Sequence, residues 1–205
     1  MSDTPTLQER VEHYQARTEQ YRRLGYDNPA TTEFVVRVAG PLSGPVLDVG
    51  TGKGSLTLEL ARQGVDVVSV DIDAEEQQLA VHLAREAGLD RFIEFVQGDA
   101  TRLSWPDEYF GWVGMLDVLH HLEDADPILD EMLRVVRPGG LLMLADFSEP
   151  GFEIIDQVHR DEGREHERSA ATVDSARARL MGAGCELVTS VEEYLHLVSV
   201  LRKPF

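Results

Sequence analysis

The chain has 205 residues, and its 37 acidic residues against 19 basic ones give a formal net charge of -18 at pH 7. A field of that sign repels polyanions, and nucleic-acid binding needs Lys and Arg against the phosphates, so no nucleic-acid partner is expected. No apolar run reaches the roughly 20 residues that a membrane-spanning helix needs. The single cysteine, Cys185, excludes an internal disulfide and a cysteine metal cluster.

These limits predict a cytoplasmic protein with neither a membrane partner nor a bound metal. The opening residues 1–15 are polar and contain no apolar signal core. The length suits one domain with a sizeable core.

Two helices are predicted first. Residues 7–24 form a polar, charged stretch of helical character that Gly25 ends. Residues 29–39 form the second, with Asn28 as the expected cap and Pro29 at the first helical position.

Short apolar runs then alternate with helical stretches. The alternation predicts an α/β fold with a doubly wound, mostly parallel sheet and helices on both faces. Strands are expected at 46–49, 65–70, 92–96, 110–116 and 141–147, and helices at 56–62, 74–87 and 126–136. The turn Pro138-Gly139-Gly140 is expected to end the last of these helices.

The tail departs from this rhythm. A helix at 173–181 ends at Gly182, and two adjoining strands at 186–191 and 194–201 follow without a helix between them. They predict a closing antiparallel hairpin, which brings the sheet to seven strands. The charged stretch 148–172 is expected to cross above the strand ends, where a substrate lid would lie.

A glycine-rich turn, Asp48-Val49-Gly50-Thr51-Gly52-Lys53-Gly54, follows the first of these strands. Ligands of doubly wound sheets bind beyond the carboxyl ends of the strands, and the next helix start offers free amides to an anion. Asp71 ends the second strand about 20 residues past Gly50, the spacing at which an acid holds ribose hydroxyls. This spacing alone fits NAD, FAD or S-adenosylmethionine.

The glycine spacing narrows the choice. A dinucleotide fingerprint, G-x-G-x-x-G, needs a third glycine where this chain has Ser55. A P-loop needs Ser or Thr after Gly-Lys, but Gly54 follows Lys53. A glycine turn by itself also serves as a tight bend between a strand and a helix.

Four segments together resemble the class I S-adenosylmethionine-dependent methyltransferases, especially the small-molecule group that includes quinone-biosynthesis enzymes. VLDVGTGKGSLTLELA is similar to their first motif and VVSVDID to their second-strand acid. FVQGDATRLSWPDEYFGWV is similar to their third motif with the run into the fourth strand. DVLHHLEDADPILDEMLRVVRPGGLLMLADF is similar to their next helix, Pro-Gly-Gly turn and fifth strand.

The resemblance implies a cofactor, S-adenosylmethionine, whose product is S-adenosylhomocysteine. The methionine end would lie against Leu116 and the glycine turn with its preceding acid, the ribose against Asp71, and the adenine against Ile72, Asp99 and Ala100. The implied turn residues are Asp48, Gly50, Thr51, Gly52 and Gly54. Two positions depart from the family pattern: Gly111 stands where Asp is usual, and Lys53 replaces a small or polar residue.

The expected domain therefore has four parts. They are a helical cap at 1–44, a cofactor-binding core at 45–147, a crossover or lid at 148–172, and a closing helix and hairpin at 173–205.

Methyl transfer needs mainly alignment, because the sulfonium is already a strong electrophile. A general base is required only if the acceptor must lose a proton. The candidate catalytic residues, Asp117, His120 and His121, follow the fourth strand, where the methyl group would emerge. The two adjacent histidines are not expected to bind a metal, because neighbouring side chains diverge.

The expected acceptor is a small molecule. The motif of enzymes that methylate amino groups of DNA bases is absent after the fourth strand, where Gly114-Met115-Leu116-Asp117 stands. One cysteine is too few for a thiolate-based arsenite methyltransferase. Two alternatives remain open here: an NAD(P)-dependent oxidoreductase on a Rossmann fold, and a non-catalytic cofactor-binding partner subunit.

Overall fold

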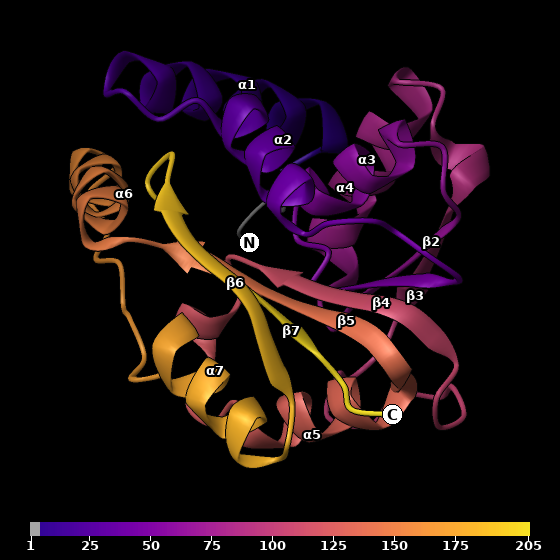
Figure 1. The fold of residues 1–205 in the computed structure, drawn as a ribbon. Helices are drawn as coiled ribbons and strands as arrows, with labels where there is room; N and C mark the ends of the chain where they lie inside the picture. The colour runs from indigo at the N-terminus through magenta and orange to yellow at the C-terminus, as the bar shows by residue number, and fades with distance from the viewer. Residues whose placement is uncertain (1–4) are drawn as a thin grey trace.

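A computed structural model describes residues 5–205, so the first four residues of the expected cap lie outside the described residues. Seven strands form one sheet in the order β3-β2-β1-β4-β5-β7-β6 (Figure 1). Only β7 runs antiparallel to its neighbours, β5 and β6. The strands are β1 Val46–Val49, β2 Val67–Asp71, β3 Ile93–Gln97, β4 Phe110–Leu116, β5 Val136–Phe147, β6 Glu186–Glu193 and β7 His196–Arg202. The predicted fold class, with its closing hairpin, is confirmed.

Helices cover both faces of this sheet. In Figure 1, α5 and α7 lie below the sheet, α1 to α4 lie above it, and α6 stands beside the hairpin tip. The helices are α1 Leu7–Arg23, α2 Asn28–Val38, α3 Ser55–Arg62, α4 Ala74–Glu86, α5 Asp126–Val135, α6 Glu149–Asp161 and α7 Val173–Gly182. Two short 3-10 turns span Asp90–Phe92 and Leu119–His121. No helix within residues 5–205 has both the length and the apolar character needed to cross a bilayer.

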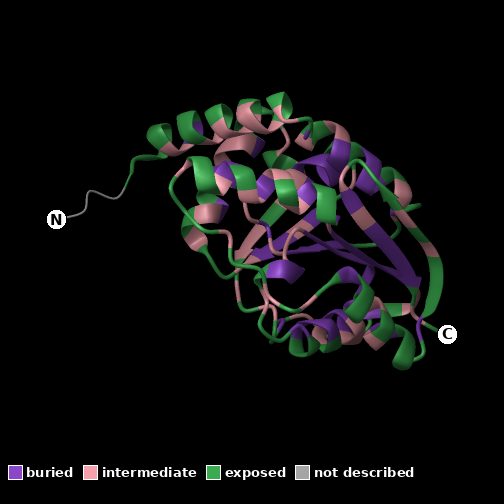
Figure 2. Ribbon diagram, turned by 90° about the vertical axis from the view of Figure 1, so that its left-hand side faces the viewer, coloured by how far each residue is buried: buried purple, intermediate pink, exposed green. Residues whose placement is uncertain are grey.

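The central strands are buried on both faces, as Figure 2 shows by their purple colour. All seven residues of β4 are buried. Because successive side chains of a strand point to opposite faces, Val113 and Met115 join the core against α5 and α7. Trp112 and Leu116 join the core against α2 and α3. A strand covered on both sides reads as a continuous apolar run, which is why the sequence located β4.

Three local predictions are wrong. The cap of α2 is Asp27, whose side chain accepts from the Ala30 amide, while Asn28 is already helical. Residues 138–140 do not form a turn before the fifth strand. They belong to an irregular stretch of β5, which pairs at Val136 with Phe110 and next at Leu141 with Trp112.

The third concerns Tyr194, which was expected in a strand. Tyr194 and Leu195 form the hairpin turn instead, with φ values of 50° and 65°. Positive φ at both central positions is the geometry of a type I′ turn, whose twist matches that of the flanking strands. Without the usual Asn or Gly to signal the turn, the sequence hides it.

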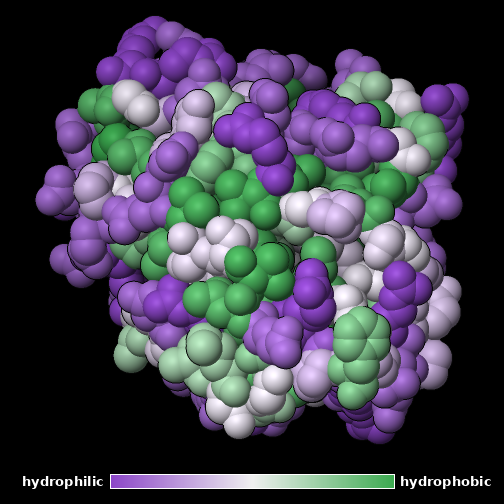
Figure 3. Space-filling model, in the orientation of Figure 1, coloured by the Kyte–Doolittle hydropathy of each residue, from purple (hydrophilic) through white to green (hydrophobic). Residues whose placement is uncertain are grey.

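One edge strand of the sheet is β6, which pairs with β7 alone. Leu187 and Val188 of β6 are exposed. In the face of the molecule that Figure 3 shows, apolar side chains gather near the middle among hydrophilic ones. The strand also carries Glu186, Glu192 and Glu193. Charged side chains along an edge strand oppose pairing with another chain.

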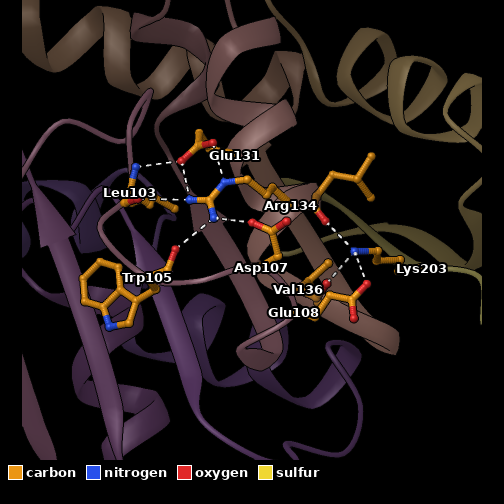
Figure 4. A network of polar contacts seen from close by, with 9 residues as sticks. Leu103, Trp105, Asp107, Glu108, Glu131, Arg134, Val136 and Lys203 are labelled. Atoms are coloured by element: carbon orange, nitrogen blue, oxygen red, sulfur yellow. Dashed lines mark hydrogen bonds and ion pairs between the residues drawn. The ribbon is translucent and has the colours of Figure 1, made fainter.

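The loop before β4 is held by Arg134 of α5 (Figure 4). The guanidinium donates to both carboxylate oxygens of Glu131, each at 2.7 Å, and to the carbonyl oxygens of Leu103 and Trp105 at 3.0 and 2.9 Å. A fifth contact reaches the Asp107 carboxylate at 2.9 Å. The planar guanidinium group of arginine carries five N–H donors, so it can bond to all of these acceptors at once.

We expect Arg134→Lys to lower the free energy of unfolding by about 2 kcal/mol, because one ammonium cannot replace the bonds to two backbone carbonyls. Urea denaturation measures this change. The matched control is Arg62→Lys, since Arg62 makes a single ion pair with Glu59 at the surface. Its expected effect is within about 0.5 kcal/mol, and an equal effect at both positions would contradict the prediction.

Candidate functional site

A cavity of about 880 Å³ opens at the carboxyl ends of β1, β2 and β4. This is the edge where doubly wound sheets bind their ligands. Most of the candidate residues line it: Gly50, Thr51, Gly52, Asp71, Ile72, Asp99, Ala100, Leu116, Asp117, His120 and His121. Asp48 and Gly54 are not on the wall.

The glycine turn is fastened to the neighbouring strand. The amides of Gly50 and Thr51 both donate to the Val70 carbonyl, at 2.8 and 3.1 Å. Gly50 has a φ of 86°, and a Cβ there would lie 2.4 Å from Cγ2 of Val118. At Gly52, with a φ of 48°, a Cβ would meet no atom within 4 Å. The missing side chain at Gly52 therefore leaves free space beside the backbone, on the cavity wall.

Gly54 turns the chain into α3. Its φ is 87°, and a Cβ would lie 2.9 Å from Cβ of Ala80 on α4. As the N-cap it supplies no side-chain acceptor, so the first amides of α3 have no capping partner. Ser55 and Leu56 at this helix start line the cavity. A helix N-terminus of this kind favours a carboxylate or phosphate.

Asp71 joins the end of β2 to the glycine turn. One carboxylate oxygen accepts from the Gly52 amide at 2.7 Å and the other from the Asp73 amide at 2.8 Å. A carboxylate has about four lone-pair positions, so Asp71 keeps acceptor capacity for two hydroxyl groups.

The next side chain, Ile72, is apolar and yet 70% exposed. On the wall of the cavity it offers a surface for a flat ring. Asp99 lies beyond it and accepts from the amide and hydroxyl of Thr101, both at 2.8 Å. These hydrogen bonds hold the pKa of Asp99 below its ordinary value, so its carboxylate stays ionised.

Asp48 lies beneath the turn rather than on the wall. It is buried, and Oδ2 accepts from the hydroxyls of Thr57 and Ser69, the latter at 3.4 Å. Its Oδ1 has no hydrogen-bond partner among the described residues. Burial raises the pKa of Asp48 from 3.8 to about 7. The geometry makes Asp48 a brace, because Ser69 also bonds to Thr51 of the glycine turn at 2.6 Å.

This buried acid gives stability a distinct pH dependence. The folded pKa lies above the unfolded value, so the folded state binds more protons between pH of about 4 and 7, and the free energy of unfolding falls as pH rises. We expect Asp48→Asn to raise the free energy of unfolding by on the order of 2 kcal/mol at pH 8, with the gain fading toward pH 4. Urea denaturation across this range measures it. Asp66→Asn, at an exposed position, is the control, and a gain independent of pH would refute the assignment.

The three catalytic candidates have different surroundings. Nδ1 of His120 lies 2.7 Å from Oδ1 of Asp146, whose Oδ2 accepts from the His120 amide at 3.0 Å. Asp117, with a φ of 57°, contacts Nε2 of the fully buried His196 at 2.8 Å. Burial lowers the pKa of His196, but Asp117, with the Tyr194 carbonyl and Asp146, outweighs this effect, and the pKa is raised.

His121 is not oriented by a carboxylate. Burial, together with the neighbouring His120 and His166, lowers its pKa to about 4, so it is neutral at pH 7. Its ring centroid lies 3.9 Å from that of His120. The expectation that these adjacent side chains diverge is therefore wrong.

Sequence reasoning missed Asp146 and His196 as members of this region. Asp146 comes near the carboxyl end of β5, and β5 pairs in parallel with β4, which leads to His120. Two neighbouring parallel strands end at the same edge, so an acid near one end and a histidine after the other were a readable signal. His196 follows the hidden hairpin turn, and no local pattern indicated that its ring would reach Asp117.

Two further segments complete the enclosure. Tyr14 and Tyr21 of α1 and Tyr26 just after it line the cavity. Tyr26 is buried and stacks on His196 with ring centroids 5.8 Å apart. Helix α6 and the segment after it supply further wall residues, Ile155, His159, Arg164 and His166. Lys53 also faces the cavity, and burial lowers its pKa.

Comparison with known proteins places this arrangement in a family. Residues 47–144 match the family model described as a methyltransferase domain. Over 130 residues the chain is 32% identical to the ubiquinone/menaquinone biosynthesis C-methyltransferase UbiE of Vibrio vulnificus, covering 62% of this chain and 50% of that protein. Over 174 residues it is 32% identical to the 27-O-demethylrifamycin SV methyltransferase of Amycolatopsis mediterranei, covering 80% of this chain and 57% of that protein. Residues 47–144 of this chain are therefore a methyltransferase domain.

The methyltransferase family resemblance found in the four sequence segments is thus confirmed, and neither alternative finds support. The chain spans about half the length of the curated methyltransferases that it matches. The fold itself hosts more than one reaction. The solved structure of the [4+2]-cyclase SpnF has a TM-score of 0.70 at 19% identity and covers 98% of both chains.

Proposed function

We propose that this protein transfers a methyl group from S-adenosylmethionine to a small-molecule acceptor. One observation carries the proposal: a single cavity has the glycine turn and Asp71 on its wall together with His120. The glycine turn and Asp71 suit the methyl donor, and His120 suits a methyl acceptor bound next to it. The acceptors in the names of UbiE and the rifamycin methyltransferase are those of the two relatives, and neither is assigned to this chain.

The wall residues fit the parts of S-adenosylmethionine. Free space at Gly52 and the uncapped start of α3 suit the amino-acid end, with Lys53 adding positive charge. The remaining acceptor positions of Asp71 suit two ribose hydroxyls, and exposed Ile72 suits the adenine ring. In this proposal the contact surface is completed by Gly50, Thr51, Asp99, Ala100 and Leu116, while Asp48 and Gly54 shape the turn from behind.

Calorimetry tests the donor site. Titration with S-adenosylmethionine and S-adenosylhomocysteine is expected to give dissociation constants in the micromolar range. Absence of binding to both, combined with thermal stabilisation by NADH, would replace the proposal with an oxidoreductase.

A methyl-release assay over pools of small metabolites tests the transfer itself. Formation of S-adenosylhomocysteine with at least one pool is the expected result. Tight cofactor binding without turnover on any pool would favour the non-catalytic partner subunit. A cytoplasmic location and the absence of nucleic-acid and membrane partners stay predictions from composition, as does the four-part division of the domain.

A further inference from the structure

Basic side chains gather on one part of the cavity wall, although the chain carries a formal net charge of -18. Arg17 comes from α1 and Lys53 from the glycine turn. His159 belongs to α6, and Arg164 follows that helix, with its amide donating to the His159 carbonyl at 2.8 Å. Helices α1 and α6 contact each other, which brings these four residues, the basic cluster, to the same part of the wall.

The basic cluster holds more positive charge than its carboxylate partners neutralise. Glu162 is shared between two guanidinium groups, since it lies 3.5 Å from Nε of Arg17 and also pairs with Arg164. The ammonium of Lys53 lies 3.8 Å from Glu76. Two carboxylates therefore face three permanent cations.

The cations of the basic cluster also act on one another. Burial, together with the charges of Arg17 and Arg164, lowers the pKa of Lys53. Burial, Arg17, His166 and Arg164 lower the pKa of His159 to about 4, so its ring is neutral at pH 7. An anion bound among these groups would relieve their mutual repulsion.

Two members of the basic cluster have hydrogen-bonding capacity that the protein leaves unused. Among the described residues, four buried side-chain nitrogen or oxygen atoms lack a hydrogen-bond partner, and two of them are Nε of Arg17 and Nδ1 of His159. The Arg17 side chain is only 12% exposed. Because buried polar groups of native proteins are nearly always hydrogen-bonded, two unsatisfied groups on one cavity wall indicate a ligand there.

The position of the basic cluster favours the acceptor over the donor. The His159 ring lies 4.7 Å from His166, and His166 lies 5.3 Å from His120, beside which the proposed function puts the acceptor. The single carboxylate of S-adenosylmethionine already has the uncapped start of α3. Arg17 and Arg164 exceed what that one carboxylate needs, which leaves them for a second anionic group.

Other acids on the cavity wall do not neutralise the basic cluster. Besides Glu76 they are Asp71, Asp99, Asp117, Glu123 and Asp124. The first two accept from backbone amides on the donor side, and Asp117 pairs with His196 at 2.8 Å. The last two are exposed. Within residues 5–205, none of the five forms an ion pair with the basic cluster.

We propose that Arg17 and Arg164 bind an anionic group of the methyl acceptor, a carboxylate or a phosphate. The inference rests on the function proposed above and names the chemical class of its acceptor. Planar guanidinium groups donate pairs of hydrogen bonds to such anions, and the ring of His159 adds a further polar contact. Held at this end by α1 and the segment after α6, the acceptor extends toward the donor.

Anion exchange tests the class of the acceptor. A metabolite extract is separated at pH 7 into a fraction that an anion-exchange resin retains and a fraction that it does not, and each is supplied to the protein with S-adenosylmethionine. S-Adenosylhomocysteine formation is expected with the retained fraction. Treatment of that fraction with alkaline phosphatase then separates the two sources, since lost activity identifies a phosphate and persisting activity a carboxylate.

Substitutions test the two arginines. Arg17→Gln and Arg164→Gln are each expected to raise the amount of retained fraction needed for half-maximal rate at least about 10-fold, and to leave the dissociation constant of S-adenosylhomocysteine unchanged in calorimetry. The Arg164 side chain is 50% exposed, so its replacement keeps the fold even if Arg17→Gln disturbs it. The control, Arg160→Gln, removes the same charge from an exposed position of α6 outside the cavity wall and should behave as wild type.

A binding measurement without turnover uses inorganic phosphate as the probe. The protein is saturated with S-adenosylhomocysteine, and NMR follows the Arg17 Nε–H signal, which is assigned by its loss in Arg17→Lys. At an ionic strength held constant with sodium chloride, phosphate is expected to shift this signal in wild type and in Arg160→Gln, and to shift it much less in Arg164→Gln. An unchanged signal in wild type would overturn the anion site.

Failure of this inference differs from failure of the proposed function. Absence of S-adenosylhomocysteine binding, or of its formation with either fraction, would refute the proposed function. Normal cofactor binding with equal or faster turnover of the unretained fraction would refute the anionic acceptor alone. If the two arginine variants weaken S-adenosylhomocysteine binding as much as they weaken use of the retained fraction, Arg17 and Arg164 bind the donor carboxylate instead.

Discussion

Replacing Asp71 by alanine is expected to weaken S-adenosylmethionine binding at least about 100-fold. Each hydrogen bond to a charged group is worth about 1.5 to 3 kcal/mol, and two ribose hydroxyls would lose theirs together. The change also removes the acceptor of the Gly52 amide, which lies 2.7 Å from Asp71 and belongs to the turn that faces the amino-acid end. Isothermal titration calorimetry measures the dissociation constant directly.

Two variants separate these effects. Asp71→Asn keeps one acceptor oxygen and the shape of the side chain, so we expect a smaller loss than with alanine. Glu75→Ala removes an exposed acid from the start of α4, outside the cavity wall, and should leave binding unchanged. If Asp71→Ala binds the cofactor as tightly as Glu75→Ala does, the ribose role of Asp71 is wrong.

Introducing a side chain at Gly111 is expected to prevent folding or to lower the free energy of unfolding by at least about 4 kcal/mol. A Cβ there would lie 1.7 Å from the backbone carbonyl oxygen of Ser43. The Gly111 amide meanwhile donates to the Pro45 carbonyl at 2.9 Å, so the two segments cannot separate without losing that bond. The clashing atoms belong to the Ser43 backbone, so the movement of a side chain cannot relieve the clash.

Gly111→Ala is the least intrusive test, with soluble yield and thermal unfolding as readouts. The control is Gly182→Ala at the end of α7, where a Cβ would meet no atom within 4 Å. That change should stabilise the protein by about 0.5 to 1 kcal/mol, because alanine is the better helix former. Equal stability of the two variants would show that the strand relaxes away from Ser43.

The Gly111 contact also explains a departure from the family pattern. The family pattern usually has Asp at this position, where this chain has Gly111. In this chain the close approach of residues 43–45 to β4 takes the place of that side chain. Aspartate would fit here only if this approach were rebuilt.

The sequence was sufficient wherever a pattern is local. Apolar runs located the central strands, because a strand buried on both faces cannot be polar. The glycine turn and Asp71 could be assigned together because the ends of parallel strands meet at one edge. Both rules depend only on spacing along the chain.

The acceptor side was less predictable because its contacts join distant residues. His120 and Asp146 are 26 residues apart, and Asp117 and His196 are 79 apart. Nothing near His196 in the sequence indicates which carboxylate it meets. The irregular start of β5 and the turn at Tyr194 were missed for a different reason, since their conformations lack the usual residue signals.

The hairpin turn joins segments that are far apart in the sequence. Its Tyr194 carbonyl accepts from the Thr31 hydroxyl at 3.2 Å, and its Leu195 carbonyl accepts from the Ser148 amide at 2.9 Å. His196, the next residue, reaches Asp117 at 2.8 Å. Thr31 belongs to α2, Ser148 precedes α6 and Asp117 follows β4. A two-residue turn and the residue after it thus fasten three separate segments together, so a change in the turn is expected to disturb all three.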